Sequence, residues 1–114
     1  MSRRLAPDDF RRTQPRWQAD NLAVNLKLVD QVRSIAAKYD AAASQVALAW
    51  VLARGEDVVP IPGTKRRRYL EENVGSLDLV LDAEDLAMLS DLQPAGERYP
   101  DMTWGTGDTA PLRT

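Results

Sequence analysis

The chain has 114 residues, and its 15 basic and 17 acidic side chains give a formal net charge of -2. This length fits one domain at most, and the near balance of charge argues against a general polyanion binder. The chain contains no cysteine, which excludes disulfides and thiolate metal sites. It also contains no histidine, which removes the commonest general acid or base and the commonest metal ligand.

No apolar run approaches the roughly 20 residues that a membrane span needs. The basic N-terminus is not followed by the apolar core of a signal peptide. We therefore expect a cytoplasmic protein that does not associate with a membrane.

The first predicted segment, residues 1–20, is an irregular arm. It holds Pro7 and Pro15, and its only large aromatic side chains are Phe10 and Trp17. A segment with so few apolar residues does not form a core of its own, so we expect it to lie against another part of the protein.

Two helices are predicted next, over residues 22–39 and 44–54. In the first, Leu28, Val32, Ile35 and Tyr39 recur at helical spacing and predict one buried face, with Asp20 or Asn21 as N-cap. In the second, Ser44 is the expected N-cap, Gly55 the expected terminator and Trp50 a core residue.

Residues 58–61 predict a single buried strand. Val58, Val59 and Ile61 favour extended structure, although Pro60 lacks the amide that a sheet ladder needs. A buried strand without a ladder partner would leave its backbone groups unsatisfied, so we expect the neighbouring strands to lie outside this chain.

Two further helices follow, one over residues 66–76 and one that begins at Asp82. Asp82 and Asp85 are expected to be capping residues of the last helix. Residues 93–114 are rich in glycine and proline and predict an irregular C-terminal tail. Near its end, Trp104 could border a binding site, and Arg98 could pair with Asp101.

The segment in which we expect a ligand-binding site runs from Pro60 to Val74. A glycine turn at Gly63 leads into a helix whose first turn is cationic, and cations at a helix N-terminus oppose the helix dipole. The Thr64 hydroxyl, the Lys65 and Arg66 charges and the free amides of the first turn would suit a phosphate.

Two other interpretations of this basic run stay open. It could be a solvated charge run, with Arg67 paired to Glu71 and Arg68 paired to Glu72 at i,i+4 spacing. It could also be a nuclear-localisation or nucleic-acid patch, which the nearby acidic residues disfavour, so we expect no nucleic-acid partner.

Residues 59–66 (VPIPGTKR) and 70–75 (LEENVG) closely resemble the C-terminal NADP-binding motif of aldo-keto reductases. Residues 44–52 (SQVALAWVL) resemble the helix that precedes this motif, and the resemblance extends from about residue 9 to residue 99. Within the superfamily, the chain looks most like the NADPH-dependent carbonyl reductases of the bacterial and plant branch.

This resemblance implies an α/β fold, the C-terminal portion of a (β/α)8 TIM barrel. The barrel would be incomplete and mostly helical here, with one or few short strands, because such barrels need about 250 residues. Residues 1–114 would form a single partial domain: an arm over 1–20, helices and the last barrel strand over 21–92, and a tail over 93–114.

The resemblance also implies the site residues. Gly63 would form the turn, Thr64, Lys65 and Arg66 would contact the adenosine 2′-phosphate of NADP(H), and Glu72 and Asn73 would contact the adenine. Many members carry an arginine where this chain has Tyr69, so the phosphate would depend on Lys65 and Arg66, with Arg68 as a further candidate.

The implied function is that of a fragment of an NADP(H)-dependent reductase acting on a small aldehyde or ketone. The family transfers hydride with an Asp, Tyr, Lys and His set, which this chain does not complete, so we expect it to be inactive alone. The alternative is a standalone, non-catalytic helical module with a phosphate or nucleotide site. We also expect self-association through apolar surface that the missing barrel would cover.

Overall fold

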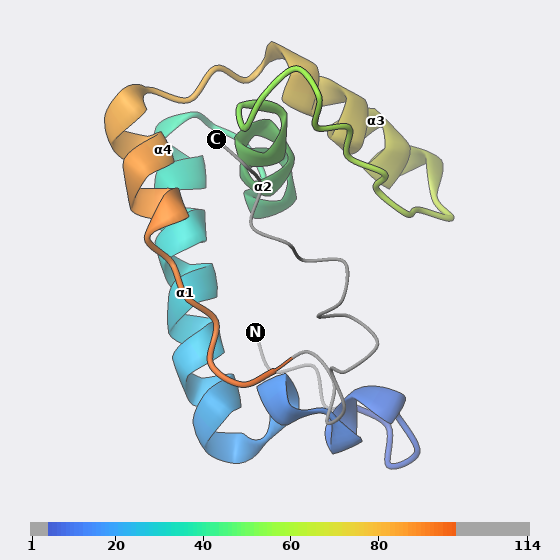
Figure 1. Ribbon diagram of the computed structural model, residues 1–114. Coiled ribbons are helices and arrows are strands. Elements are labelled where there is room, and N and C mark those ends of the chain that lie inside the picture. The colour runs from blue at the N-terminus through green and yellow to red at the C-terminus, as the bar shows by residue number, and fades with distance from the viewer. Residues whose placement is uncertain (1–4, 98–114) are drawn as a thin grey trace. The chain divides into compact units, whose positions relative to one another are not determined.

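The computed structural model describes residues 5–97, which fall into two compact units. One unit contains the described residues up to Leu26 together with those from Pro94 onward, and the other contains Lys27–Gln93. The helices are α1 (Ala19–Lys38), α2 (Ala43–Leu52), α3 (Arg67–Gly75) and α4 (Ala83–Ser90), as labelled in Figure 1. Among residues 5–97, no helix is both long enough and apolar enough to cross a membrane.

The core of the Lys27–Gln93 unit is built by faces of α1, α2 and α4 together with Leu81, which precedes α4. Its buried apolar side chains are Ile35, Ala36, Val46, Ala49, Leu81 and Leu89. Trp50 packs against this cluster as expected, and its indole nitrogen donates a hydrogen bond to Ser90 Oγ at 3.0 Å. The apolar spacing in the sequence therefore predicted the buried face of α1, and Trp50 was correctly predicted as a core residue of α2.

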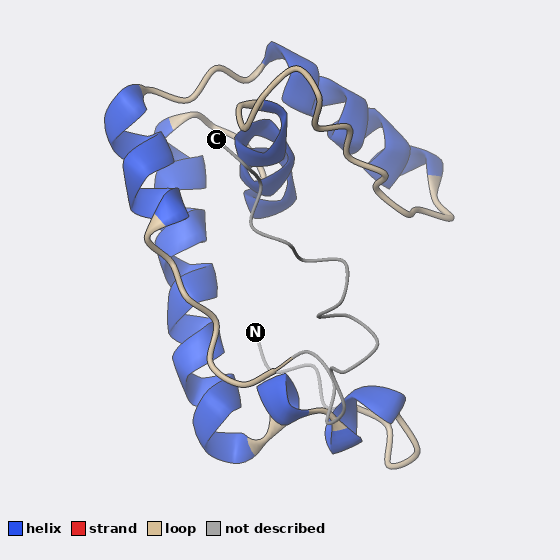
Figure 2. Cartoon of the chain, in the orientation of Figure 1, coloured by secondary structure: helices blue, strands red, loops and turns tan. Residues whose placement is uncertain are grey.

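The expected strand over residues 58–61 is wrong for the described part of the chain. Figure 2 shows only helices and loops there, and residues 53–66 form an irregular connection between α2 and α3. Val59 is 77% exposed and Ile61 is 92% exposed. A strand exists only when a neighbour accepts and donates its ladder hydrogen bonds, and residues 5–97 offer no such neighbour.

Helix boundaries differ from the predicted ones mainly at the caps. α1 begins at Ala19, which places Asp20 inside its first turn instead of at the cap. The N-cap of α2 is Ala42, not Ser44, because Gln45 Oε1 accepts the Ala42 amide at 2.9 Å. α2 also ends at Leu52, before Gly55.

The last two described helices follow the prediction closely. α3 spans nearly the expected range, and Asp82 caps α4 by accepting the Asp85 amide at 2.8 Å. A short 3-10 turn, Ser76–Asp78, follows α3 directly and contacts α2.

The expected irregular arm contains two 3-10 turns, Phe10–Thr13 and Pro15–Trp17, followed by the start of α1. The Asn25 side chain of α1 joins this segment to the residues after α4. Its amide donates to Arg16 O at 3.1 Å and to Ala95 O at 3.0 Å, and its oxygen accepts from Ala95 N at 2.7 Å. The rest of the predicted tail lies outside the described residues, with Trp104 and the expected Arg98–Asp101 pair.

Candidate functional site

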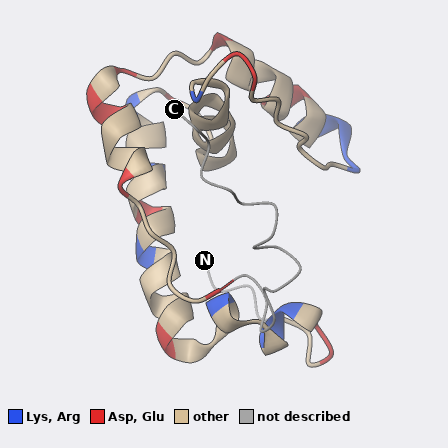
Figure 3. Ribbon diagram, in the orientation of Figure 1, with Lys and Arg blue, Asp and Glu red and all other residues tan. Residues whose placement is uncertain are grey.

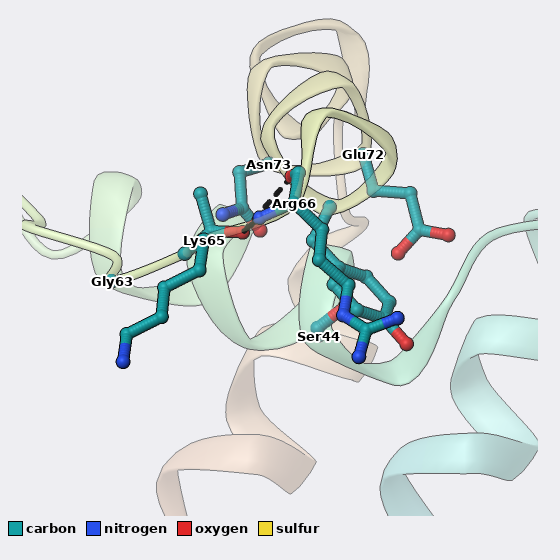
Figure 4. A pocket seen from close by; sticks show the side chains of 8 residues that line it. Ser44, Gly63, Lys65, Arg66, Glu72 and Asn73 are labelled. Carbon is teal, nitrogen blue, oxygen red and sulfur yellow. Dashed lines mark hydrogen bonds between the residues drawn. The ribbon is translucent and has the colours of Figure 1, made fainter.

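An open pocket lies between the start of α2, the end of the 53–66 connection and α3. Its volume is about 760 Å³. The six residues assigned to the cofactor site line it, namely Gly63, Thr64, Lys65, Arg66, Glu72 and Asn73, whereas the further candidate Arg68 does not. The structure thus brings together residues that the sequence had grouped by motif, as Figure 4 shows, while their role in binding a cofactor stays a prediction.

The backbone before α3 is shaped by the Thr64 hydroxyl. It accepts the amide hydrogen of Arg66 at 3.2 Å and lies 3.1 Å from the Arg66 carbonyl. Arg66 is the N-cap of α3 and supplies no side-chain cap, while its carbonyl accepts the Tyr69 and Leu70 amides. Among residues 5–97, no acceptor takes the amide hydrogens of Arg67 and Arg68, so these two donors are available to a ligand.

The charge at this helix start opposes the helix dipole. The first turn of α3 has no acidic residue, whereas the first turn of α4 carries Glu84 and Asp85 behind the Asp82 cap. Figure 3 shows the basic residues gathered at this end of α3. The first turns of α3 and α4 thus carry charges of opposite sign. The basic first turn of α3 has no acidic side chain that would favour the helix dipole.

The basic side chains here are largely uncompensated within the described part of the chain. Lys65 and Arg66 are exposed and form no ion pair with any residue in 5–97, and in the view of Figure 4 their head groups point to different sides. Of the two expected i,i+4 pairs, Arg68 and Glu72 approach to 3.7 Å, while the Arg67–Glu71 pair is not formed. All four basic residues from Lys65 to Arg68 are exposed, so the solvated-charge interpretation stays open, with one of its two expected ion pairs formed.

Two lining residues were not predicted to belong to the site. Ser44, expected to be a cap, lines the pocket from the first turn of α2. Tyr69 also lines it, and the Arg68 guanidinium lies 5.2 Å from the centre of its ring. A cation over an aromatic face is favourable, so the tyrosine helps to place a positive charge beside the pocket wall.

A second polar cluster lies away from the pocket, on α1 and α4. Asp85 is fully buried, accepts Lys38 Nζ at 2.6 Å and accepts the Tyr39 hydroxyl at 2.6 Å. The Asp82 amide donates to the same hydroxyl at 3.0 Å. The expectation that Asp85 is a capping residue is therefore wrong, because its carboxylate joins two helices inside the core.

The contacts of this cluster shift the pKa of each member. Hydrogen bonds from Lys38, and then from Tyr39, lower the pKa of Asp85 below its ordinary value of 3.8. The bond to Asp85 raises the pKa of Lys38 above 10.5 and that of Tyr39 above 10.0. The arrangement stabilises an ionised carboxylate beside a neutral phenol and a charged amine.

Comparison with known proteins adds to this geometry. A model of the aldo/keto reductase family matches residues 2–94. The chain belongs to this family. Membership implies that its helices are part of a TIM barrel, of which residues 5–97 show no strand.

Several curated aldo-keto reductases are similar to the chain. It is 45% identical over 91 residues to aldo-keto reductase str7 of Strobilurus tenacellus, covering 80% of this chain and 27% of the relative. It is 43% identical over 96 residues to aldo-keto reductase yakc [NADP(+)] of Schizosaccharomyces pombe, covering 81% and 28%. It is 40% identical over 105 residues to probable aldo-keto reductase 1 of Glycine max, covering 85% and 30%.

The chain spans less than a third of the length of these aldo-keto reductases. No solved structure matches it. The narrower assignment to the bacterial and plant branch stays a prediction, because the relatives come from Strobilurus tenacellus, Schizosaccharomyces pombe and Glycine max.

Proposed function

We propose that this chain is the part of an NADP(H)-dependent aldo-keto reductase that holds the adenosine 2′-phosphate of the cofactor. The complete enzyme would reduce a small aldehyde or ketone to an alcohol, and this chain would supply none of the groups that transfer hydride. The observation that carries the proposal is the pocket at the start of α3, which is lined by Lys65 and Arg66, two cations without an ion-pair partner among residues 5–97.

The donor set of the pocket fits a phosphate. Lys65 and Arg66 line the pocket and bring full positive charges, and the neighbouring amides of Arg67 and Arg68, which do not line it, have no acceptor within residues 5–97. A phosphate there would satisfy the amides and reverse the unfavourable sign of the helix terminus. Further along α3, Glu72 and Asn73 line the same pocket and offer acceptors and a donor of the kind that adenine needs.

The cofactor supplies the hydride in such a reductase, and the protein supplies binding and orientation. Lys38, Tyr39 and Asp85 are of the same residue types as three members of the family's catalytic set. They do not line the pocket, and they satisfy one another in the core. The raised pKa of Tyr39 also makes its hydroxyl a poorer proton donor, so we assign the cluster to stability.

The proposal is tested by titrating adenosine 2′-monophosphate and adenosine into the full chain and into its Lys65→Ala and Arg66→Ala variants. Each substitution removes one charged contact to an exposed phosphate, which is worth about 1–2 kcal/mol, or roughly 5- to 30-fold in affinity. Adenosine lacks the phosphate and should bind each variant as it binds the unaltered chain.

Lys27→Ala is the matched control, because Lys27 is an exposed basic residue of α1 and does not line the pocket. It should change neither affinity. Equal loss of both ligands in the pocket variants, or no loss of either, would assign the basic run to solvation instead of phosphate binding.

One observation favours a second candidate, a non-catalytic helical module that keeps the nucleotide site. The apolar core and the Lys38–Tyr39–Asp85 cluster connect α1, α2 and α4, and no strand takes part within residues 5–97. The DNA upstream of the Met1 codon separates the two candidates. An in-frame sequence that encodes further barrel strands supports the reductase, and a stop codon immediately upstream supports the module.

A further inference from the structure

The pocket has two walls, and one side chain connects them. Gln45 belongs to the first turn of α2, next to the pocket residue Ser44. Its Oε1 accepts the Ala42 amide at 2.9 Å, and its Nε2 donates to the Glu72 carbonyl of α3 at 2.9 Å. The same amide group therefore caps one helix and holds the other.

The Glu72 carbonyl needs this partner because of how α3 ends. In a continued α-helix it would accept the Ser76 amide, but that amide donates to the carbonyls of Asn73 and Val74 instead. The Ser76 hydroxyl also donates to the Asn73 carbonyl at 2.6 Å, and Ser76 is buried. Gln45 thus satisfies the carbonyl that the tightened last turn releases.

The contact also depends on the absence of a side chain at Gly75. A Cβ added there would lie 2.8 Å from Gln45 Nε2, which is too close for the amide to stay in place. Gly75 has ordinary helical φ, so its backbone conformation does not require glycine. Its small size is what lets the Gln45 amide reach the last turn of α3.

We infer that Gln45 is a positioning residue for the cofactor's adenosine, setting where Glu72 and Asn73 stand in the pocket by tying the last turn of α3 to the start of α2. The inference rests on the proposed function, since those two residues face the adenine in it. Gln45 does not itself line the pocket, and Gly75 makes its contact with α3 sterically possible.

Two variants of the full chain separate positioning from general stability. Gln45→Glu keeps an oxygen for the Ala42 amide but replaces the donor with a carboxylate oxygen facing the Glu72 carbonyl. Gly75→Ala leaves Gln45 unchanged and displaces its amide, while alanine improves the helix propensity of α3. Ser90→Ala is the control, because it removes the partner of Trp50 away from the pocket.

Both variants should weaken adenosine 2′-monophosphate and adenosine by the same factor, about 5- to 10-fold, the value of one lost hydrogen bond. This differs from Lys65→Ala, which should affect only the phosphate-bearing ligand. Gly75→Ala should lose this affinity without a lower melting temperature, whereas Ser90→Ala should lower the melting temperature without losing affinity.

Hydrogen exchange of the ligand-free chain tests the hydrogen bond between Gln45 and the Glu72 carbonyl independently of ligand binding. Faster exchange of the amides of residues 73–76 in both variants, but not in Ser90→Ala, supports it. The inference is overturned if the amides of residues 73–76 exchange at an unchanged rate in Gln45→Glu and Gly75→Ala, or if both variants bind the two ligands as tightly as Ser90→Ala does. If the unaltered chain binds adenosine 2′-monophosphate no better than adenosine, the proposed function fails instead, and the exchange data alone decide the role of Gln45.

Discussion

Asp85 shows how a single carboxylate connects two helices. Its side chain has no solvent exposure, and it keeps its charge because Lys38 and Tyr39 both donate to it. Burying a carboxylate without partners would cost far more than these contacts return, so each partner is needed for the ionised form. The cluster therefore makes the stability of the Lys27–Gln93 unit depend on pH at both ends of the scale.

The direction of that dependence follows from the pKa shifts. Asp85 has a lowered pKa, so its contribution is present above the ordinary carboxyl value of 3.8 and is lost as the pH falls through the folded-state value. Lys38 has a raised pKa, so its contribution is present below 10.5 and is lost as the pH rises through its folded-state value.

We predict that Asp85→Asn lowers the midpoint of urea unfolding at neutral pH and flattens both limbs of its pH profile. The substitution leaves the Lys38 charge without its carboxylate and removes the group that titrates in acid. Asp30→Asn is the control, because Asp30 is exposed and its distance to Arg33 is 3.8 Å. A profile of Asp85→Asn parallel to that of the unaltered chain would contradict the assignment.

Asp9 contributes an acid limb of its own, which the comparison has to take into account. The side chain and amide of Arg11 lower the pKa of Asp9 to about 2. Both variants retain this pair, so its contribution is common to all three proteins and cancels from their differences. The effect of Asp85 is then read from the difference alone.

The sequence predicted which residues line the pocket better than it predicted the tertiary contacts that hold the helices around it. The motif grouped Gly63 to Asn73, and the pocket is lined by the six residues assigned to the cofactor from it, though not by the further candidate Arg68. Asp85 was misassigned because a first-turn acidic residue fits capping equally well, and only the tertiary approach of α1 distinguishes the two roles. Gln45 carries a weak local signal, its place three residues after the α2 cap, but its bond to Glu72 spans 27 residues of sequence.

At the scale of elements, residues 58–61 are an extended apolar segment that lies largely exposed. Val59 and Ile61 are among its most exposed apolar side chains, and the segment has no strand neighbour within residues 5–97. Extended apolar backbone with free ladder groups can pair with another chain. This segment is where we expect self-association to begin.

We predict that Ile61→Lys reduces self-association of the chain in sedimentation velocity runs at increasing concentration. A charged side chain at the edge of an unpaired extended segment disfavours pairing with a second copy. Because Ile61 is 92% exposed, the melting temperature at low concentration should stay unchanged. If Ile61→Lys and the unaltered chain associate equally, another surface is responsible.

The sequence predicted the helices correctly but not the strand expected over residues 58–61. A helix satisfies its own backbone, so periodicity and local caps located α3 and α4 to within a few residues. A strand depends on its neighbours, and an apolar β-branched run therefore indicates only a capacity to pair. The chain covers less than a third of the length of its aldo-keto reductase relatives. This is consistent with ladder partners for residues 58–61 in other parts of the barrel.

At the scale of the whole molecule, we predict no NADPH-dependent reduction of aldehydes by a preparation that contains only this chain. The proposed role is to bind adenosine, and the Tyr39 hydroxyl, which is engaged by Asp85 and by the Asp82 amide, is not offered to a substrate. The loss of NADPH absorbance in the presence of an aldehyde measures the reduction directly, and mass spectrometry verifies that the preparation contains only this chain. Turnover that rises with chain concentration would overturn the fragment interpretation.

The irregular connection before α3 has a consequence for protease attack. Trypsin cleaves after lysine and arginine in exposed, irregular backbone, and Lys65, Arg66, Arg67 and Arg68 lie at the end of that connection and the start of the helix. Limited digestion should therefore cut here early and separate the α1–α2 part from the α3–α4 part. A ligand held by the same cations would shield the cut, so added adenosine 2′-monophosphate should slow it more than adenosine does. The segment that gives the pocket its charge would then also report, by the rate at which it is cut, whether the pocket is filled.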